Sequence, residues 1–525
     1  MKKRLVIVAG CVLLVALMLT SVAYALTSAK ENLGSPQTGV KSKTVTGKKG
    51  GTLTLIYGSS PTCPGTPWSP QHAWADGQIG RFCVENLIGL DKNGNPIPQL
   101  ATSWTVKRSA KTITFNLRKG VKFQDGTDFN AAAAKWCLDK YRTGGKADLK
   151  SISAVNVTGP YQVQLVYTQY NPLLIQQMSS NYSGRMVAQS STALHPIGTG
   201  PFMWDSYQSN VAVHLKKWSG YWQKGLPYLD GVDINIVADK TVAATSFQKG
   251  EGQSLYDVAP TKAAELKSGG AKIDKLMTSI WCITGDSKNS TSKWADINFR
   301  RGIAYALPTA KMVAAASHGY WAATNQLAVK GMQAYNPAIK GYPYNVAKAK
   351  ALLAQAGVST SSPVTIPLVY MQNDESTQYV TMIQGYLSQV GVNITPKPLI
   401  TGAFYGFVKN PWKNQLLMMA FSYNGIEMQY STSAATNLSA TATSNVSVAT
   451  PDAYNAKLQD ALYQPSATKR EKDYEAMNKV LIDDDCTIVP QFGYRVLNAK
   501  SPKVKNFYSA CVTNVEFLPE IAYLK

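Results

Sequence analysis

Hydrophobic and polar residues alternate along several stretches of the chain, and this two-residue period predicts β-strands. The alternating stretches are residues 51–57, 104–123, 155–167, 211–237 and 364–370, of which 104–123 and 155–167 predict hairpins. Elsewhere apolar residues recur every three or four positions, which predicts amphipathic helices. The helical stretches are residues 76–89, 129–141, 296–318, 345–357, 374–390 and 452–485. Because strands and helices alternate along the chain, we expect a mixed α/β fold.

One polar segment interrupts this alternation. Residues 431–450 (STSAATNLSATATSNVSVAT) are rich in serine, threonine and alanine. We expect them to form a long loop inside a folded region, and long loops of this kind are often functional.

Two aspartates lie three residues apart in LRKGVKFQDGTDF, residues 117–129. Asp125 and Asp128 could form half of a metal loop, a catalytic carboxylate pair or part of the scaffold. A metal loop would need further oxygen ligands at alternating positions, which this stretch lacks. Gly126 permits a turn, and Thr127 or Asp128 can cap the helix that follows. The pattern therefore favours the scaffold.

The N-terminal segment has the composition of an export signal followed by a flexible lead-in. A basic start (residues 2–4) precedes an apolar run, and a small-x-small cleavage sequence ends at Ala25. We expect residues 1–25 to be a signal peptide and residues 26–49 to be flexible. An uncleaved anchor and lipid attachment at Cys11 are the alternatives. In each case the protein would be exported, to the periplasm or the cell surface.

The chain is strongly basic, with a net charge of +22 at pH 7 from 53 basic and 31 acidic side chains. Residues 1–25 hold three basic residues and no acid, so about +19 remains without them. Such a charge suits nucleic acid, an anionic surface or an anionic ligand. Export argues against nucleic acid, and the basic residues are dispersed. We therefore expect a solvated basic surface beside an anionic envelope.

Six cysteines remain once the signal peptide is removed. They are Cys63, Cys83, Cys137, Cys282, Cys486 and Cys511. An even number in an exported protein permits up to three disulfides, and buried free thiols are the alternative.

The motifs of common enzymes and metal sites are missing from the sequence. His72, His195, His214 and His318 form neither HExxH nor another spacing typical of metal ligands. Neither a G-x-S-x-G elbow nor a P-loop occurs. We therefore expect no catalytic residue, no metal and no cofactor, with a hydrolase of dispersed site as the remaining enzyme hypothesis.

The acid pair lies within a longer motif, PQLATSWTVKRSAKTITFNLRKGVKFQDGTDFNAAAAKWCLDKY, residues 98–141. This stretch resembles the signature of the bacterial extracellular solute-binding proteins of family 5, the peptide, dipeptide and nickel binding group that serves ABC importers. Five further segments resemble those of the family in the same order. They are IGTGPF (197–202), WSGYWQKGLPYLDGVDINIVAD (218–239), NFRRGIAYAL (298–307), YPYNVAKAKALLAQAG (342–357) and REKDYEAMNKVLIDDDCTIVPQF (470–492). The resemblance covers nearly all of residues 50–525.

The sequence also departs from the family pattern. Leu307 and Pro308 follow Ala306 where the family often has aspartate, and residues 250–253 are GEGQ in place of G-E-[VA]-D. Peptide binders of the family tend to hold the ligand's α-ammonium with an acid in a loop of the second lobe. The corresponding stretch, AFSYNGIEMQY, offers Glu427 as the nearest acid.

The resemblance implies an α/β fold of the two-lobe periplasmic-binding-protein type (class II, cluster C), with mixed sheets and a hinge of two crossings. The first lobe would be residues 50–280 plus 491–525, with an inserted subdomain at about 91–195, and the second lobe residues 281–490. Hinge closure would enclose a ligand, and the closed form would dock on an ABC permease. We expect a monomeric binding protein, not an enzyme, for a peptide or similar oligomer. A nickel-type metal chelate or an oligosaccharide is the alternative ligand.

Aromatic residues with a few polar groups are the expected cleft contacts, because a ligand cleft needs apolar walls and placed polar atoms. The expected ligand-binding residues are Cys63, Trp68, Trp281, Tyr405, Tyr423, Asn424 and Glu427. Core packing is the alternative role for each aromatic residue. Glu427 is the candidate anchor for an ammonium group, with a solvated loop acid as the alternative.

Overall fold

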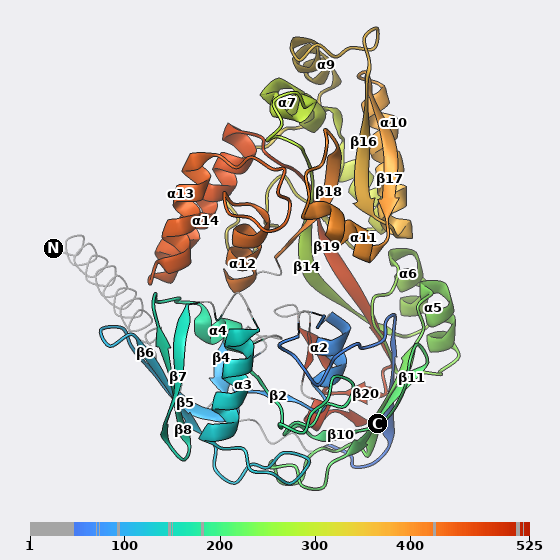
Figure 1. Ribbon diagram of the computed structural model, residues 1–525. Coiled ribbons are helices and arrows are strands. Elements are labelled where there is room, and N and C mark those ends of the chain that lie inside the picture. The colour runs from blue at the N-terminus through green and yellow to red at the C-terminus, as the bar shows by residue number, and fades with distance from the viewer. Residues whose placement is uncertain are drawn as a thin grey trace, which may run out of the picture.

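The computed structural model consists of two lobes, which lie one above the other in Figure 1. The structure describes residues 47–69, 71–72, 74–91, 95–144, 149, 151–179, 183–423, 427–510, 515–517 and 519–525. The predicted export signal, most of the lead-in, Asn424 and Cys511 lie outside these residues. Among the helices of the described ranges, none combines the length and apolar composition that crossing a bilayer requires.

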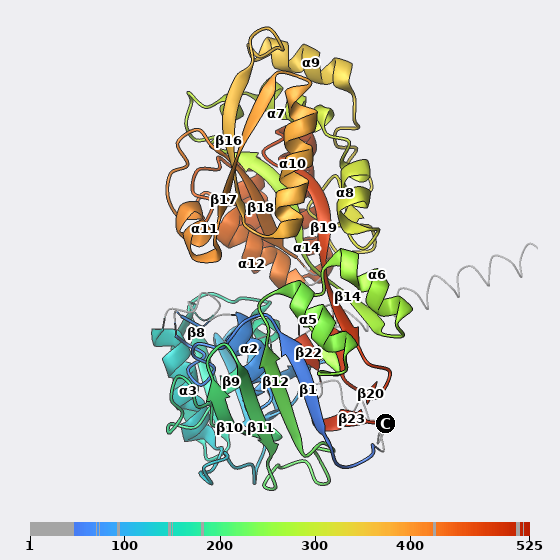
Figure 2. The same ribbon diagram turned by 90° about the vertical axis from the view of Figure 1, so that its right-hand side faces the viewer.

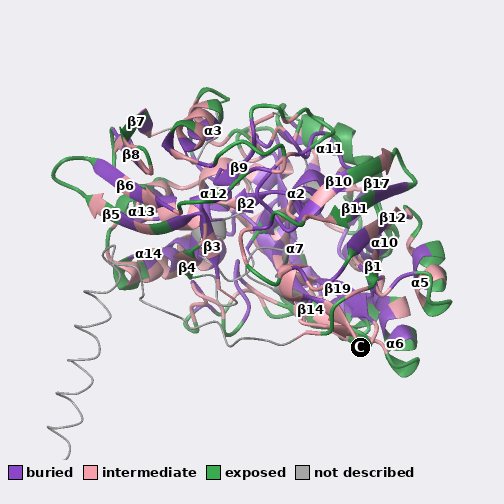
Figure 3. Ribbon diagram, turned by 90° about the horizontal axis from the view of Figure 1, so that it is seen from below, coloured by how far each residue is buried: buried purple, intermediate pink, exposed green. Residues whose placement is uncertain are grey.

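The lower lobe holds one end of a large sheet. Its strands are β1 (Thr52–Tyr57), β10 (Phe202–Gln208), β11 (Ala212–Lys217), β12 (Gly231–Ile236) and β13 (Ser254–Leu255). β12, β1 and β13 run parallel, and β10 and β11 join the edge as an antiparallel hairpin. Helices α5 (Lys240–Gln248) and α6 (Pro260–Ser268) lie at the periphery, where Figure 3 shows exposed residues. The strands predicted at residues 51–57 and 211–237 are confirmed.

A second sheet in the lower lobe contains both predicted hairpins. Its antiparallel order is β5-β6-β8-β7, from β5 (Ala101–Lys107), β6 (Thr112–Leu117), β7 (Ile152–Gly159) and β8 (Gln162–Tyr167). Helix α3 (Ala131–Thr143) packs on this sheet and is capped by the Asn130 side chain, which accepts from two backbone N–H groups. The predicted cap at Thr127 or Asp128 is therefore wrong. Those residues lie in a turn that folds back on its own strand, since Phe129 N–H donates to the Val121 carbonyl oxygen at 3.0 Å.

The upper lobe continues the large sheet with β16 (Val364–Met371), β17 (Val392–Leu399) and β18 (Leu416–Ser422). Its helices are α7 (Ile297–Ala306), α8 (Thr309–Ser317), α9 (Val346–Gln355), α10 (Asp374–Ser388), α11 (Thr401–Val408), α12 (Glu427–Asn437), α13 (Asp452–Tyr463) and α14 (Ala467–Lys479). The helix predicted at residues 296–318 is divided at Leu307-Pro308, because proline has no N–H to continue the ladder. The helices predicted at residues 345–357 and 374–390 are confirmed.

Two long neighbouring strands, β14 (Lys272–Gly285) and β19 (Val489–Lys500), pass from one lobe into the other (Figure 2). They pair antiparallel from Lys272↔Lys500 to Ile283↔Val489. β14 also pairs with β18 above, and β19 with β13 below. One sheet therefore runs through both lobes in the order β10-β11-β12-β1-β13-β19-β14-β18-β16-β17, with β15 (Ala322–Ala323) beside β19. The predicted lobe boundaries near residues 280 and 490 fall in these two strands.

Short elements complete the described chain. They are α2 (Trp74–Gly80), α4 (Leu174–Met178), β2 (Glu85–Asn86), β3 (Ile88–Leu90), β4 (Pro96–Pro98), β9 (Arg185–Met186), β20 (Val504–Lys505), β21 (Tyr508–Ala510), β22 (Val515–Phe517) and β23 (Tyr523–Leu524).

Two further expectations from the sequence are right for one part of their range and wrong for the other. The helix predicted at residues 76–89 ends at Gly80, because the next residues pair with a distant turn: Gly200 N–H donates to the Cys83 carbonyl oxygen at 2.9 Å. The loop predicted at residues 431–450 is helical up to Asn437, where α12 packs against β18. In both cases tertiary packing overrides the local pattern.

The acid pair holds the turn between β6 and α3. The Asp125 carboxylate accepts hydrogen bonds from Thr127 and, at 2.5 Å, from Ser190 Oγ. Burial alone would raise the pKa of Asp125, but these hydrogen bonds outweigh it and lower that pKa. Asp128 pairs with exposed Lys122 at 2.8 Å, and Gly126 adopts φ +87°. These contacts agree with the predicted scaffold role.

Candidate functional site

The predicted site residues lie on both lobes. Cys63 and Trp68 belong to the segment between β1 and α2, and α2 lies at the top of the lower lobe in Figures 1 and 2. Trp281 is on β14, Tyr405 is on α11 and Glu427 begins α12, at the bottom of the upper lobe in both views. The elements that carry these residues therefore face one another across the two lobes.

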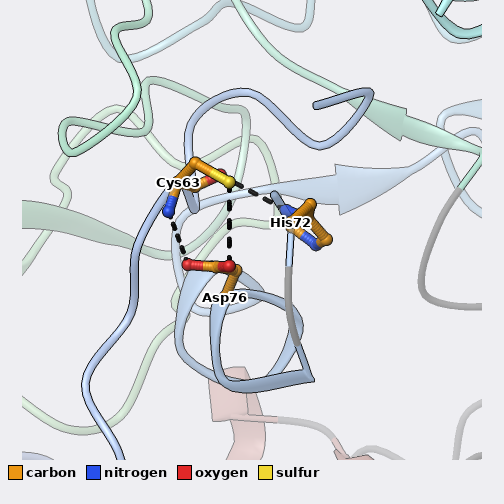
Figure 4. A group of neighbouring side chains, drawn as sticks. All are labelled: Cys63, His72 and Asp76. Carbon is orange, nitrogen blue, oxygen red and sulfur yellow. Dashed lines mark hydrogen bonds between the residues drawn. The ribbon is translucent and has the colours of Figure 1, made fainter. Parts of the chain in front are cut away.

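Cys63 contacts two residues that the sequence did not single out, His72 and Asp76 (Figure 4). One ligand atom from each of the three lies within 4.8 Å of the others. The Cys63 Sγ to Asp76 Oδ2 distance is 3.7 Å, and His72 Nδ1 lies 3.3 Å from the Cys63 carbonyl oxygen. Thiol, imidazole and carboxylate are donors that a transition metal can take. The sequence spacing of the histidines did not indicate this group, and the expectation of no metal stays a prediction.

The Asp76 carboxylate also organises the loop before it. Its Oδ1 accepts the Cys63 backbone N–H at 2.7 Å, and its Oδ2 accepts the Thr62 hydroxyl at 2.9 Å. Burial raises the pKa of the Cys63 thiol, and the negative charge of Asp76 raises it further. Cys63 is therefore a neutral thiol at pH 7 unless a cation binds beside it.

Trp68 is part of an aromatic group in the lower lobe. Its ring meets Trp136 edge-on at 5.2 Å between centroids and Tyr141 at 6.0 Å. The side chain is half-buried, so one part of it packs and another part remains accessible. Trp68 therefore packs in part against the lower lobe, and its contact with a ligand stays a prediction.

Trp281 lies in a larger aromatic group at the two crossing strands. Its ring stacks on Phe492 at 6.1 Å between centroids, and the Trp321 ring also stacks on Phe492, at 4.6 Å. Tyr494 lies beside both tryptophans, at 6.2 Å from Trp281 and 5.2 Å from Trp321. The Trp281 indole N–H is buried and has no hydrogen-bond partner in the structure.

The remaining aromatic candidates differ sharply in exposure. Tyr423 is fully buried against Tyr430, and burial raises the pKa of its hydroxyl far above the usual value. Tyr405 is 54% exposed on α11 and contacts Phe404. Tyr423 is therefore a core residue in this conformation, whereas Tyr405 is open to solvent.

Glu427 is buried and paired. The Arg470 guanidinium donates two hydrogen bonds to its carboxylate. Nε donates to Oε1, and Nη2 donates to Oε2 at 3.0 Å. The Tyr474 hydroxyl donates to Oε1 at 3.3 Å. Glu427 is thus neither a solvated loop acid nor an unpaired one, and a ligand ammonium would have to compete with Arg470.

Glu375, a buried acid of the upper lobe, pairs with Lys240 of the lower lobe. Lys240 Nζ on α5 lies 3.1 Å from Glu375 Oε1 on α10 and 3.1 Å from Asp257 Oδ2. Although burial opposes it, the two carboxylates raise the pKa of Lys240. Tyr494 of the aromatic group donates to Asp257 Oδ1 at 3.4 Å. These contacts join the lobes beside the crossing strands.

Comparison with known proteins identifies the arrangement. The model of the bacterial extracellular solute-binding proteins, family 5 (middle region), matches residues 95–445. The chain belongs to this family. The glutathione-binding protein GsiB of Shigella boydii serotype 4 is 31% identical over 330 residues, 60% of this chain and 63% of GsiB. The chain thus spans less than two thirds of the curated relatives that it matches.

Solved structures show the same two-lobe fold. NikA from Brucella suis, in complex with Fe(III)-EDTA, aligns with a TM-score of 0.77 at 19% identity, over 88% of this chain and 98% of NikA. The dipeptide binding protein from Pseudoalteromonas sp. SM9913, in complex with Met-Leu, aligns with a TM-score of 0.78 at 17% identity, over 90% and 100%. The expected family and two-lobe α/β fold are therefore confirmed.

Segments that identify family 5 meet around one buried acid, Glu85. Its carboxylate accepts hydrogen bonds from Thr199 Oγ1 at 2.7 Å, Tyr221 OH at 2.9 Å and Trp222 Nε1 at 2.8 Å. Gly198 lets this turn approach the chain closely, because an added Cβ would lie 2.2 Å from the Cys83 carbonyl oxygen. These motif residues therefore build the lower lobe.

The sequence missed the partners that define the candidate site. His72 and Asp76 follow Cys63 by nine and thirteen residues, and the four-residue step from His72 to Asp76 could have drawn attention to them. Arg470 lies 43 positions from Glu427, and nothing in the sequence near Glu427 indicates that pairing.

The five described cysteines are all buried and free, which corrects the disulfides proposed among them. They are Cys63, Cys83, Cys137, Cys282 and Cys486. Burial raises the thiol pKa of Cys137 and of Cys486 to about 12.

Proposed function

We propose that this protein is the extracytoplasmic substrate-binding protein of an ABC importer, which captures a peptide or similar oligomer between its lobes and delivers it to a permease. The proposal rests on one observation. The chain belongs to family 5, and its two lobes are joined by two adjacent, paired strands, β14 and β19. Two strands can bend together, so ligand contacts on both lobes favour a closed state. Binding and release need no covalent chemistry, so we propose no catalytic role.

The lobes of this proposal keep the boundaries drawn from the sequence. The first comprises residues 50–280 and 491–525, with a subdomain at about 91–195, and the second residues 281–490. We propose an exported monomer, periplasmic or at the cell surface, whose partners are the ligand and the permease and do not include nucleic acid. The basic charge of the chain suits an anionic envelope.

A peptide is the proposed ligand because two of the similar proteins are named for a peptide or hold one. GsiB is named for glutathione, and the Pseudoalteromonas protein holds Met-Leu. Trp68 and Trp281 are half-buried and offer rigid aromatic surface. Cys63, Tyr405, Tyr423, Asn424 and Glu427 complete the proposed contact set, and Tyr423 would need exposure by a movement of its neighbours.

A metal chelate is the second candidate, and one observation favours it. Arg470 neutralises Glu427, so the acid proposed to hold a peptide ammonium already has a cation. NikA holds Fe(III)-EDTA, an anionic chelate. An oligosaccharide is kept as a third ligand class for the same screen.

Thermal unfolding of the full purified chain separates the ligand classes. It is measured with di- to pentapeptides, nickel complexes and oligosaccharides, because a ligand of the folded state raises Tm. We expect a peptide to raise Tm, and small-angle scattering to show a smaller radius of gyration with that peptide. A response to chelates or sugars alone would refute the peptide proposal, and turnover of the ligand would refute the non-enzyme proposal.

A peptide that binds also tests the Glu427 anchor. The peptide and its N-acetylated form are compared on wild type and on Glu427→Gln, with Asp128→Asn as the matched control. An ammonium anchor predicts that either change weakens binding at least tenfold, and that the two changes together add little more. Equal affinity for both peptide forms would exclude the anchor.

A further inference from the structure

A mixed group of donor side chains lies in the lower lobe outside the motifs that identify the family. Cys63, His72 and Asp76 each offer one ligand atom, and these atoms lie within 4.8 Å of one another (Figure 4). We propose that these three residues bind one divalent transition-metal ion of the Zn²⁺ class as a resident ion of the lower lobe.

The donor set and its spacing suit this ion. Zn²⁺ is bound by cysteine sulfur, histidine nitrogen and carboxylate oxygen, commonly at four tetrahedral positions. With Zn–S of about 2.3 Å and Zn–O of about 2.1 Å, a tetrahedral site separates sulfur from oxygen by roughly 3.6 Å. Cys63 Sγ and Asp76 Oδ2 are 3.7 Å apart. The group does not suit calcium or magnesium, because those ions prefer sites made only of oxygen ligands.

The surroundings hold two of the donors in place. Asp76 Oδ1 accepts the backbone N–H of Cys63, which fixes the carboxylate and leaves Oδ2 beside the sulfur. Thr62 Oγ1 donates to Oδ2 and so lies in the outer shell. Gly65 N–H donates to the Ala193 carbonyl oxygen, which anchors the loop after Cys63. Such second-shell contacts orient metal ligands in known sites.

The charge balance also favours a divalent cation. A thiolate and a carboxylate carry two negative charges, which M²⁺ neutralises beside a neutral imidazole. Cys63 and Asp76 are buried and His72 is half-buried, so an unbalanced charge would be costly there. Binding replaces the S–H bond of Cys63 by an S–M bond and releases one proton to solvent. Three protein ligands leave one position for water or a solute donor.

Cobalt titration of the reduced, metal-free full chain tests the proposal. Co²⁺ is the probe because a Co–thiolate bond absorbs in the near ultraviolet, and Zn²⁺ added afterwards should remove that absorption. We expect one Co²⁺ per chain and release of one proton. Cys63→Ser should abolish the thiolate band, and His72→Gln should weaken binding at least tenfold. His318→Asn, which changes an exposed histidine after α8 in the upper lobe, should bind as wild type does.

The contrary results are equally specific. A wild-type chain without a thiolate band at one equivalent of Co²⁺, or Cys63→Ser with an unchanged band, would overturn the metal site. Because Cys63→Ser can disturb the loop, its Tm without metal is compared with that of wild type. If it unfolds early, His72→Gln alone decides the question, and unchanged affinity there refutes the site. These measurements use no peptide, so their failure leaves the proposed transport function standing.

Discussion

Glu85 in the lower lobe and Glu427 in the upper lobe are both buried glutamates, but they are satisfied in opposite ways. Glu85 accepts hydrogen bonds from three neutral donors, whereas Glu427 is gripped by the Arg470 guanidinium. Burial raises the pKa of Glu85, and hydrogen bonds from Trp222, Thr199, Tyr221 and Gln99 oppose that shift. An acid held by neutral dipoles suits a fixed scaffold, while an acid held by a cation can exchange that cation for another.

Removal of Glu85 should have the largest effect. Glu85→Leu leaves the Thr199, Tyr221 and Trp222 donors without their acceptor, and each unsatisfied buried donor costs about 1–3 kcal/mol. We expect the free energy of unfolding to fall by about 4 kcal/mol or more, measured by urea denaturation. Glu85→Gln keeps an acceptor and should lose less. Equal losses for both variants would mean that packing, not hydrogen bonding, sets the cost.

Removal of Arg470 tests the other side of the comparison. Arg470→Met leaves the Glu427 carboxylate buried without its cation, which costs about 3–5 kcal/mol in known buried pairs. We expect the free energy of unfolding to fall by about 3 kcal/mol, because the Tyr474 hydroxyl still donates to the Glu427 carboxylate. The double variant Arg470→Met with Glu427→Gln should recover most of this loss. A double variant no better than the single one would contradict the pair.

Glu520, on which the charge of Glu85 acts, should give the lower lobe a pH dependence. Burial, together with the charge of Glu85, raises the pKa of Glu520 to about 7. As the pH falls below about 7, Glu520 takes up a proton in the folded state but not yet in the unfolded state. The free energy of unfolding therefore increases as the pH falls from about 7 to about 4. A shift of this size corresponds to about 3 kcal/mol, and the partial exposure of the side chain reduces our expectation to about 2 kcal/mol.

Unfolding of Glu520→Gln between pH 4 and pH 8 measures this effect. The variant should lose the pH-dependent part and should be more stable than wild type at pH 8. Asp128→Asn, which changes an exposed acid, is the matched control. A wild-type chain that is more stable at pH 8 than at pH 5.5, with the same slope in Glu520→Gln, would contradict the assignment.

Glu375 extends the comparison to an acid whose cation belongs to the other lobe. Lys240→Met removes that cation, and we expect stability to fall by about 1 kcal/mol because Lys240 is partly exposed. The contact joins the lobes, so the radius of gyration of the ligand-free chain should also change. Lys262→Met, which breaks a pair within α6, is the control. Identical scattering from both variants would mean that the Lys240–Glu375 pair does not influence how the lobes sit relative to each other.

The same contrast explains what the sequence could predict. The motif segments that meet Glu85 were recognised because they resemble those of the family, but residues 76–89 around Glu85 itself were wrongly predicted to be one helix. Trp281 was predicted to lie at a crossing because the family resemblance implies a lobe boundary near residue 280. The pairing of Glu427 with Arg470 depends on how α12 and α14 pack, and the grouping of Cys63 with His72 and Asp76 depends on how the loop before α2 folds onto that helix. No periodic pattern encodes such contacts, so they appear only when distant segments are brought together.

The smallest effect should come from the acid pair at the turn after β6. Asp128→Asn breaks its pair with Lys122, but both side chains are more than half exposed, and exposed pairs contribute about 0–1 kcal/mol. We expect a change of less than about 0.5 kcal/mol and unchanged ligand affinity. Asp125→Asn should cost more, since Asp125 accepts from Ser190 and Thr127 across the turn. If Asp128→Asn lowered ligand affinity as strongly as a change at Glu427, the turn would belong to the binding site and the distinction between scaffold acids and site acids would fail.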